Sequence, residues 1–172
     1  MRSLLSILLL LSLALPAQAY DLTLHDAPAS VYFSPRGGAQ NALVQRIDQA
    51  RESIYVLAYS FTSEPIVAAL VRAHARGVHV EAVLDRGQRR AKGGQGQALA
   101  DSGAKVFIDA RHAIAHNKVM LIDGRTLVTG SFNFTKSAED HNAENLMVLD
   151  SPEAVDLYRE NYLKHLGHSQ GM

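Results

Sequence analysis

The sequence lacks cysteine altogether, and its 17 basic and 17 acidic residues leave no net charge over 172 positions. Without cysteine the chain has neither disulfide bonds nor thiolate metal sites. Without net charge it has no global basic field of the kind that attracts nucleic acid, so any anion site must be local. The sequence also shows no internal repeat and no low-complexity linker, and its 47% apolar content is typical of a globular protein.

Long apolar runs are also missing, because no stretch reaches the roughly 20 residues that span a bilayer. The apolar run at 4–15 follows Arg2 and ends in the small residues 16–19, Pro-Ala-Gln-Ala. This pattern is typical of a secretory signal peptide cleaved after Ala19. We therefore predict a signal peptide at 1–19, a single domain at 20–172, and a periplasmic or secreted protein without stable membrane insertion. A retained, uncleaved anchor is the alternative.

Strand and helix patterns alternate through the first half of the chain. Strands are predicted at 31–35, 53–60, 78–85, 104–109 and 145–149, and helices at 40–51, 63–76, 97–102 and from 151 onward. The nearly continuous apolar character of 53–60 is typical of a strand buried on both faces. The predicted fold class is α/β, with a mixed β-sheet flanked by helices on both faces.

The most informative stretch runs from His116 to Glu144 and contains a predicted β-hairpin. His116 and Lys118 lie two positions apart, so in an extended strand they share a face. Asp123-Gly124 is a strong turn signal. A two-residue turn would place His116 opposite Ser131 and Lys118 opposite Thr129, whereas a three-residue loop would shift this register by one.

Polar groups converge after the hairpin. Ser131 and Asn133 are two residues apart, so an imidazole, an ammonium, a hydroxyl and an amide can meet. This set of groups suits a phosphate. Ser131 and Asn133 are also ordinary turn residues after a strand, and Asp123 is equally what a hairpin turn requires.

These residues form the strings H-x-K-x4-D (His116, Lys118, Asp123) and G-S-x-N (from Gly130), followed by Asn142 and Glu144. Together they resemble the signature of the phospholipase D superfamily, and most of all its small, single-motif bacterial endonucleases. The resemblance implies a phospholipase D/nuclease-like fold and a phosphodiesterase that acts through a covalent phosphohistidine intermediate. It also implies that Glu144 accepts a hydrogen bond from Nδ1 of His116 and so fixes its tautomer.

The predicted catalytic residues are His116, Lys118, Ser131, Asn133, Glu144 and Asp123. Histidine suits nucleophilic attack and proton transfer because its pKa lies near neutrality. Lys118 would neutralise a phosphoryl oxygen that Ser131 and Asn133 also hold. For Asp123 a structural or electrostatic role is favoured over contact with the substrate.

A basic loop follows the strand predicted at 78–85. Arg86, Arg89, Arg90 and Lys92 would either be solvated or track a nucleic-acid backbone, and Arg111 would add to them. His112 and His116 have the spacing of a metal-binding pair on a helix, but this segment reads as strand and Lys118 would repel a cation. No metal and no cofactor are therefore predicted.

The chain carries one copy of the motif, because only His116 of its eight histidines is followed by lysine two residues later. Larger members of the superfamily resemble two fused copies. We therefore predict a homodimer with the two His116 side chains facing each other across the two-fold axis. The expected function is a metal-independent, nonspecific DNA/RNA endonuclease. The alternatives are a phospholipase D that hydrolyses headgroups and, less favoured, a non-catalytic DNA-binding subunit of a transfer or secretion assembly.

Overall fold

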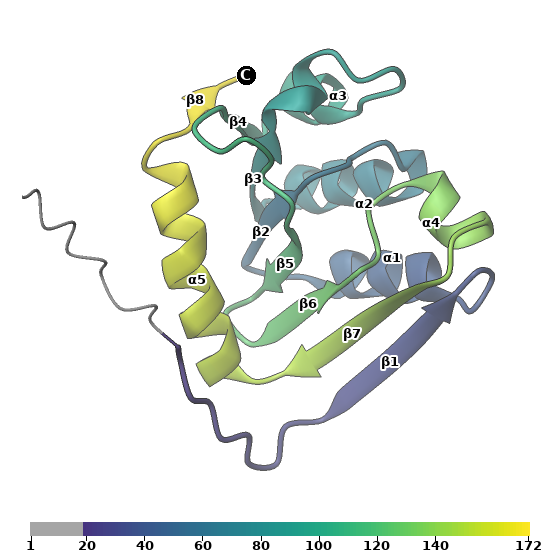
Figure 1. The fold of residues 1–172 in the computed structure, drawn as a ribbon, viewed down its shortest axis with the longest axis vertical. Coiled ribbons are helices and arrows are strands. Elements are labelled where there is room, and N and C mark those ends of the chain that lie inside the picture. The colour runs from purple at the N-terminus through teal and green to yellow at the C-terminus, as the bar shows by residue number, and fades with distance from the viewer. Residues whose placement is uncertain (1–18) are drawn as a thin grey trace, which may run out of the picture.

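The computed structural model describes residues 19–172, so the predicted signal peptide lies outside the described residues except for Ala19. The described part builds one eight-stranded sheet in the order β1-β7-β6-β5-β2-β3-β4-β8 (Figure 1). Its strands are β1 (Ala29–Ser34), β2 (Ser53–Ala58), β3 (His79–Asp85), β4 (Lys105–Asp109), β5 (Lys118–Ile122), β6 (Thr126–Gly130), β7 (Glu144–Asp150) and β8 (Gln170–Gly171). The pairs β2–β3 and β3–β4 are parallel and the other pairs are antiparallel, so the sheet is mixed.

Helices cover both faces of this sheet. They are α1 (Ala39–Gln49), α2 (Glu64–Ala75), the 3₁₀ turn η1 (Arg86–Arg89), α3 (Gly96–Asp101), α4 (Lys136–Asp140) and α5 (Pro152–Leu166). Apolar residues of α1 to α4 join one core cluster, whereas α5 packs alone in a second cluster on the other face. Figure 1 shows α5 on one side of the strands and α1 and α2 on the other. The predicted α/β class with helices on both faces is confirmed.

Local sequence explains where these helices lie. In α1, Ala39, Leu43 and Ile47 repeat every four residues and are fully buried. The α5 helix begins after Ser151, whose Oγ accepts a hydrogen bond from the Ala154 amide (3.2 Å). The strand β2 sends Ile54 and Val56 into one cluster and Leu57 into the other, as expected of a strand buried on both faces.

The hairpin between β5 and β6 has the register expected of the three-residue loop and not that of the two-residue turn. Val119 pairs with Thr129, and Ile122 pairs with Thr126, so the loop has three residues. The left-handed backbone of Asp123 (φ 53°) and Gly124 (φ 64°) accommodates it. The predicted pairing of Lys118 with Thr129 is therefore wrong by one position. His116 is not in the strand at all, since β5 begins at Lys118.

Two short elements, β8 and α4, were not predicted from the sequence. The sequence predicted 145–149 as the final strand, but β8 follows α5 and pairs with β4 through Ile108 and Gln170. The five-residue α4 was also not predicted. Its start is fixed by Thr135, whose Oγ1 accepts a hydrogen bond from the Ala138 amide (3.1 Å). Elements this short carry too few apolar residues to show a periodicity.

Candidate active site

The motif residues other than Asp123 gather where the parallel strands β2, β3 and β4 finish, which we call the carboxyl end of the sheet. Lys118, the first residue of β5, pairs with Ala58, the last residue of β2. Gly130, the last residue of β6, pairs with Leu146 near the start of β7. The strands β5, β6 and β7 therefore bring their motif residues to one end of the sheet, next to the end of β2. In open α/β sheets this end is where ligands bind.

His116 and Lys118 meet around Tyr59, the residue that follows β2. The rings of His116 and Tyr59 have centroids 4.5 Å apart and an interplanar angle of 57°. The Lys118 Nζ lies 5.0 Å from the centroid of the Tyr59 ring, within cation–π range. It also donates a hydrogen bond to the backbone oxygen of His116 (3.0 Å). The Tyr59 ring thus contacts both the imidazole and the ammonium.

Lys118 is almost buried, at 7% exposure. Desolvation by burial lowers the pKa of its ammonium, and the charge of Glu144 partly opposes this shift. Glu144 begins β7, two strands away from β5, which corresponds to about 10 Å between backbones. A cation with few neighbours to neutralise it is well prepared to bind an anion.

The segment after β6 is held by alternating anchors. Phe132 and Phe134 are buried in the larger core cluster. Ser131 precedes Phe132, and Asn133 lies between the two phenylalanines. Both the Ser131 and the Phe132 amides donate to the backbone oxygen of Asn145 (3.1 Å each). The Oδ1 atom of Asn133 is buried and has no hydrogen-bond partner within residues 19–172. This oxygen can accept a hydrogen bond from a donor group, whereas the Nδ2 group of the same amide is the part that can donate to a phosphoryl oxygen.

The backbone at Gly130 explains why the G-S-x-N string begins with glycine. Its φ of 149° lies in the region that L side chains rarely adopt. A Cβ atom there would overlap the backbone oxygen of Asn145, the same oxygen that accepts the two amide hydrogen bonds. Glycine is therefore required for β7 to approach the end of β6 and for Ser131 to take its position.

The predicted hydrogen bond from His116 to Glu144 is not present among the described residues. Glu144 Oε1 instead accepts from Nδ2 of Asn142 (3.1 Å). The Ser131 Oγ accepts from the Asn145 amide (3.0 Å), which orients its hydroxyl. Among the described residues, Glu144 therefore bears on the site through the effect of its charge on the pKa of Lys118, and not through a contact with the imidazole.

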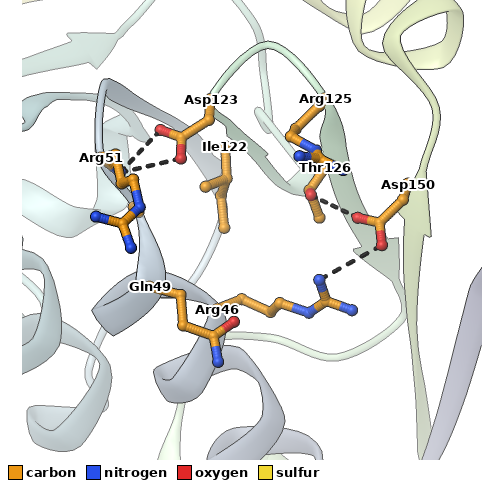
Figure 2. Close-up of a pocket in the computed structure, with 9 residues that line it drawn as sticks. Arg46, Gln49, Arg51, Ile122, Asp123, Arg125, Thr126 and Asp150 are labelled. Atoms are coloured by element: carbon orange, nitrogen blue, oxygen red, sulfur yellow. Dashed lines mark hydrogen bonds and ion pairs between the residues drawn. The ribbon is translucent and has the colours of Figure 1, made fainter.

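Asp123 lies at the other end of β5, away from the remaining motif residues. Its carboxylate accepts hydrogen bonds from the backbone amides of Arg51, Glu52 and Ser53 at 2.8 to 3.2 Å. These bonds fasten the hairpin loop to the start of β2. A cavity of about 270 Å³ beside it is lined by arginines, among them Arg46, whose guanidinium pairs with Asp150 (Figure 2).

The basic loop begins directly at the carboxyl end of β3. All four of its predicted cations, Arg86, Arg89, Arg90 and Lys92, are exposed. The buried carboxylate of Asp85 joins this loop to the reactive segment. Its Oδ1 accepts from the Gly87 amide (2.7 Å), and its Oδ2 accepts from the Ala115 amide (2.8 Å). Asp85 therefore fixes the residue before His116 relative to the loop, a role that the sequence did not indicate.

His112 and His116, whose spacing would suit a metal-binding pair on a helix, do not form one. Residues 110–117 are bends and coil, and His116 packs on Tyr59. His112 instead approaches Asp109, His165 and His168. Sequence reasoning missed this cluster, although D-x-x-H at 109–112 and H-x-x-H at 165–168 are the signals that point to it.

Comparisons with known proteins agree with this geometry. Residues 43–166 match the family described as cardiolipin synthase, PLD-like domain. The chain belongs to the phospholipase D superfamily and is a phosphodiesterase of that type. It is 42% identical to phospholipase D of Rickettsia bellii over 140 residues, which is 81% of this chain and 70% of that protein.

Two solved structures share the fold almost completely. Nuc from Salmonella typhimurium, a phospholipase D family member, superposes with a TM-score of 0.82 and 35% identity, covering 86% of this chain and 99% of that one. NucT from Helicobacter pylori gives a TM-score of 0.79 and 27% identity, covering 86% and 100%. The predicted membership of the superfamily and the predicted phospholipase D/nuclease-like fold are confirmed.

Proposed function

We propose that the protein is a metal-independent endonuclease that cleaves DNA, and also RNA, without sequence preference. The observation that carries this proposal is the exposed basic loop at the carboxyl end of the sheet, joined by Asp85 to the residue before His116. Arginine and lysine contacts to phosphates supply affinity that does not depend on the base sequence. A nucleic-acid backbone lying along this loop would pass next to His116.

His116 is the nucleophile of the proposed reaction. Its Nε2 attacks phosphorus, the bond to the leaving oxygen breaks, and that oxygen takes a proton from His116 of the partner subunit. Water then attacks the phosphohistidine, releases His116, and returns a proton to the partner imidazole. Lys118, Ser131 and Asn133 bind the non-bridging oxygens, and the ammonium supplies positive charge where charge develops.

A homodimer completes this site, since one chain supplies one motif histidine. Apolar side chains exposed near the carboxyl end of the sheet support such an interface. Ile114, two residues before His116, is 57% exposed, and Phe33, next to the end of β1, is 68% exposed. Association that covers these side chains would remove apolar surface from water and bring two sites together.

Hydrolysis of phospholipid headgroups is the second candidate. It is favoured by the Rickettsia relatives that bear the name phospholipase D. No helix within residues 19–172 is long and apolar enough to cross a bilayer. The two candidates share the same chemistry at His116 and differ in what the surface around it binds.

Export is part of the same proposal. Cleavage after Ala19 would release the single catalytic domain into the periplasm or the medium, where a nonspecific nuclease does not reach the cell's own DNA. The mass of the protein recovered from periplasm and medium tests this, because cleavage at Ala19 gives one defined N-terminus. A chain found in the cytoplasm with residues 1–19 intact would contradict it.

The decisive experiment compares wild type with His116→Ala on supercoiled DNA, single-stranded RNA and phosphatidylcholine vesicles, in excess EDTA. We expect nicking and cleavage of nucleic acid in EDTA, lost by more than about 10³-fold in the variant. Replacing Arg89 and Arg90 together by glutamine should raise the KM for DNA and weaken its salt dependence. Headgroup release without nucleic-acid cleavage would establish the phospholipase instead, and DNA binding without either activity would establish the non-catalytic subunit.

A further inference from the structure

Three histidines and one aspartate form a compact cluster outside the site described above. Asp109 is the last residue of β4, and His112 lies in the loop that leads to His116. His165 is in the last turn of α5, and His168 follows that helix before β8. One potential ligand atom from each of the four residues lies within 4.8 Å of the others. We call these residues the His₃Asp cluster.

All three imidazoles converge on a single oxygen. The Oδ2 of Asp109 lies 2.8 Å from Nδ1 of His112, 2.7 Å from Nδ1 of His165 and 3.2 Å from Nε2 of His168. A carboxylate oxygen offers about two lone-pair directions, so three ring nitrogens exceed what hydrogen bonding alone can use. Nε2 of His168 is in fact buried without a hydrogen-bond partner in the described part of the chain.

Two backbone hydrogen bonds hold the Asp109 carboxylate in a fixed orientation, with Oδ2 available to a ligand. Asp109 is fully buried, and its Oδ1 accepts from the backbone amides of Arg111 (3.0 Å) and His112 (3.3 Å). These two bonds fix the plane of the carboxylate and leave Oδ2 facing the imidazoles. Outer hydrogen bonds that orient a ligand in this way are a recurring feature of metal sites.

From this geometry we propose that the His₃Asp cluster binds one transition-metal ion, with Zn²⁺ as the preferred ion. Three imidazole nitrogens and one carboxylate oxygen form a tetrahedral donor set of the kind that Zn²⁺ takes. With bonds of about 2.0–2.1 Å the edges of such a tetrahedron measure about 3.3 Å, so shifts below about 1 Å per atom complete the site. Mg²⁺ and Ca²⁺ are excluded by the nitrogen ligands, because both prefer oxygen.

The proposed ion has a structural role. Four protein ligands leave no open position for water or substrate, which distinguishes structural from catalytic zinc sites. The ligands come from two distant parts of the chain, 109–112 and 165–168. Metal binding would therefore fasten the end of α5 to the loop that runs from β4 to His116. His165 and His168 are only 13% and 18% exposed, whereas His112, at 45%, closes the cluster on its outer side.

The test uses the chain from residue 20 without a histidine tag, stripped with a chelator and dialysed. Titration with ZnCl₂ in a calorimeter should give one equivalent bound per chain, confirmed by elemental analysis. Zn²⁺ at 100 times its Kd should raise Tm by about 5–10 °C. Substitution of Co²⁺ should produce the visible absorption of a tetrahedral nitrogen and oxygen site.

Variants assign the binding to these residues. Asp109→Asn and His168→Ala should each lose the stoichiometric binding and the rise in Tm. His25→Ala removes an exposed histidine far from the cluster in sequence and should change neither. If both cluster variants fail to fold, the titration of the stripped wild type still decides.

A wild-type chain without a stoichiometric site, or cluster variants that bind as tightly as wild type, would overturn the proposal. The outcome is independent of the nuclease assay. Binding and Tm are measured without substrate, and the proposed phosphoryl transfer uses no metal.

Discussion

Lys118 is the clearest case of a residue whose charge suits the proposed site but is unfavourable for the stability of the fold. Burial desolvates its ammonium, which lowers the pKa and makes the charged form less favourable in the folded state, although the charge of Glu144 partly opposes this. Within residues 19–172 its ammonium donates one hydrogen bond, to the backbone of His116. This arrangement supports the proposal that Lys118 contributes to anion binding more than to stability.

Replacing Lys118 by methionine should separate these two contributions. Methionine has a similar length and fills the same space without a charge. We expect kcat to fall by at least about 100-fold, because the cation at the phosphoryl oxygens is lost. Tm should stay equal to that of wild type or rise. A large fall in Tm would show that Lys118 is mainly structural.

Asp123 should behave in the opposite way. Asp123→Ala leaves the amides of Arg51, Glu52 and Ser53 without their acceptor, so the free energy of unfolding should fall by about 1–3 kcal/mol in urea titrations. The activity per folded molecule at 25 °C should remain within about twofold of wild type. Asp123→Asn keeps one acceptor oxygen, so its free energy of unfolding should lie between those of wild type and Asp123→Ala. Loss of activity at unchanged stability would return Asp123 to the catalytic residues.

Among single residues, the sequence indicated which side chains lie near one another better than which contacts they make. The spacing of His116, Lys118, Ser131 and Asn133 predicted that their polar groups can meet, and the structure brings all four residues to one end of the sheet. It did not indicate Tyr59, because an aromatic residue at the end of an apolar strand looks like any other core residue.

Among the elements, α5 is attached to the sheet by a buried polar contact as well as by apolar packing. The hydroxyl of Tyr162 donates to Oε1 of Glu81 in β3 (3.0 Å). Burial raises the pKa of this phenol far above its usual value, and the charge of Glu81 adds to the shift. The phenol therefore stays protonated in the folded protein under conditions in which it ionises in the unfolded chain.

This contact makes stability depend on pH in a defined direction. The pKa of Tyr162 is higher in the folded than in the unfolded chain, so its contribution is complete below about pH 10 and is lost as pH rises further. The free energy of unfolding of wild type should fall above that pH by up to about 1.4 kcal/mol per unit more than that of Tyr162→Phe. At pH 7 the variant should be less stable by about 1–3 kcal/mol. Parallel urea curves between pH 7 and 11 measure both, and equal slopes for the two proteins would refute the assignment.

The hairpin shows how far elements can be predicted. Strand identity and the turn at Asp123-Gly124 follow from local sequence, but the register depends on whether Arg125 belongs to the loop. Local sequence does not decide this, because contacts such as those from Asp123 to Arg51 and Ser53 contribute to the choice. Both lie more than 60 positions away in the chain.

For the molecule as a whole, the proposed dimer makes the strongest prediction. Wild type and His116→Ala can be mixed in equal amounts, unfolded and refolded together so that subunits exchange at random. If every active dimer needs both imidazoles, activity should fall to about one quarter of that of wild type alone at the same total concentration. Independent subunits would retain about one half. Light scattering on the same samples checks that each mixture is dimeric.

Long-range assembly is also where the sequence was least informative. The His₃Asp cluster joins residues 109–112 to residues 165–168, and only the pairing of strands and the packing of α5 bring these segments together. Two short polar pairs in unrelated parts of a chain carry no periodicity and no shared motif. The α/β class and the hairpin, by contrast, follow from patterns contained within about 30 neighbouring residues.

The basic loop and the motif residues follow different strands at the same end of the sheet. Asp85 connects the loop to the residue before His116 by binding backbone amides rather than side chains. Side chains in the loop can therefore be exchanged without disturbing the bridge. For the proposed nuclease, a library randomised at Arg86, Arg89, Arg90 and Lys92, with Asp85 and Gly87 held constant, is the natural starting point for selecting a changed substrate preference. A scaffold arranged in this way can acquire a new preference in small steps, each of them leaving the reaction itself intact.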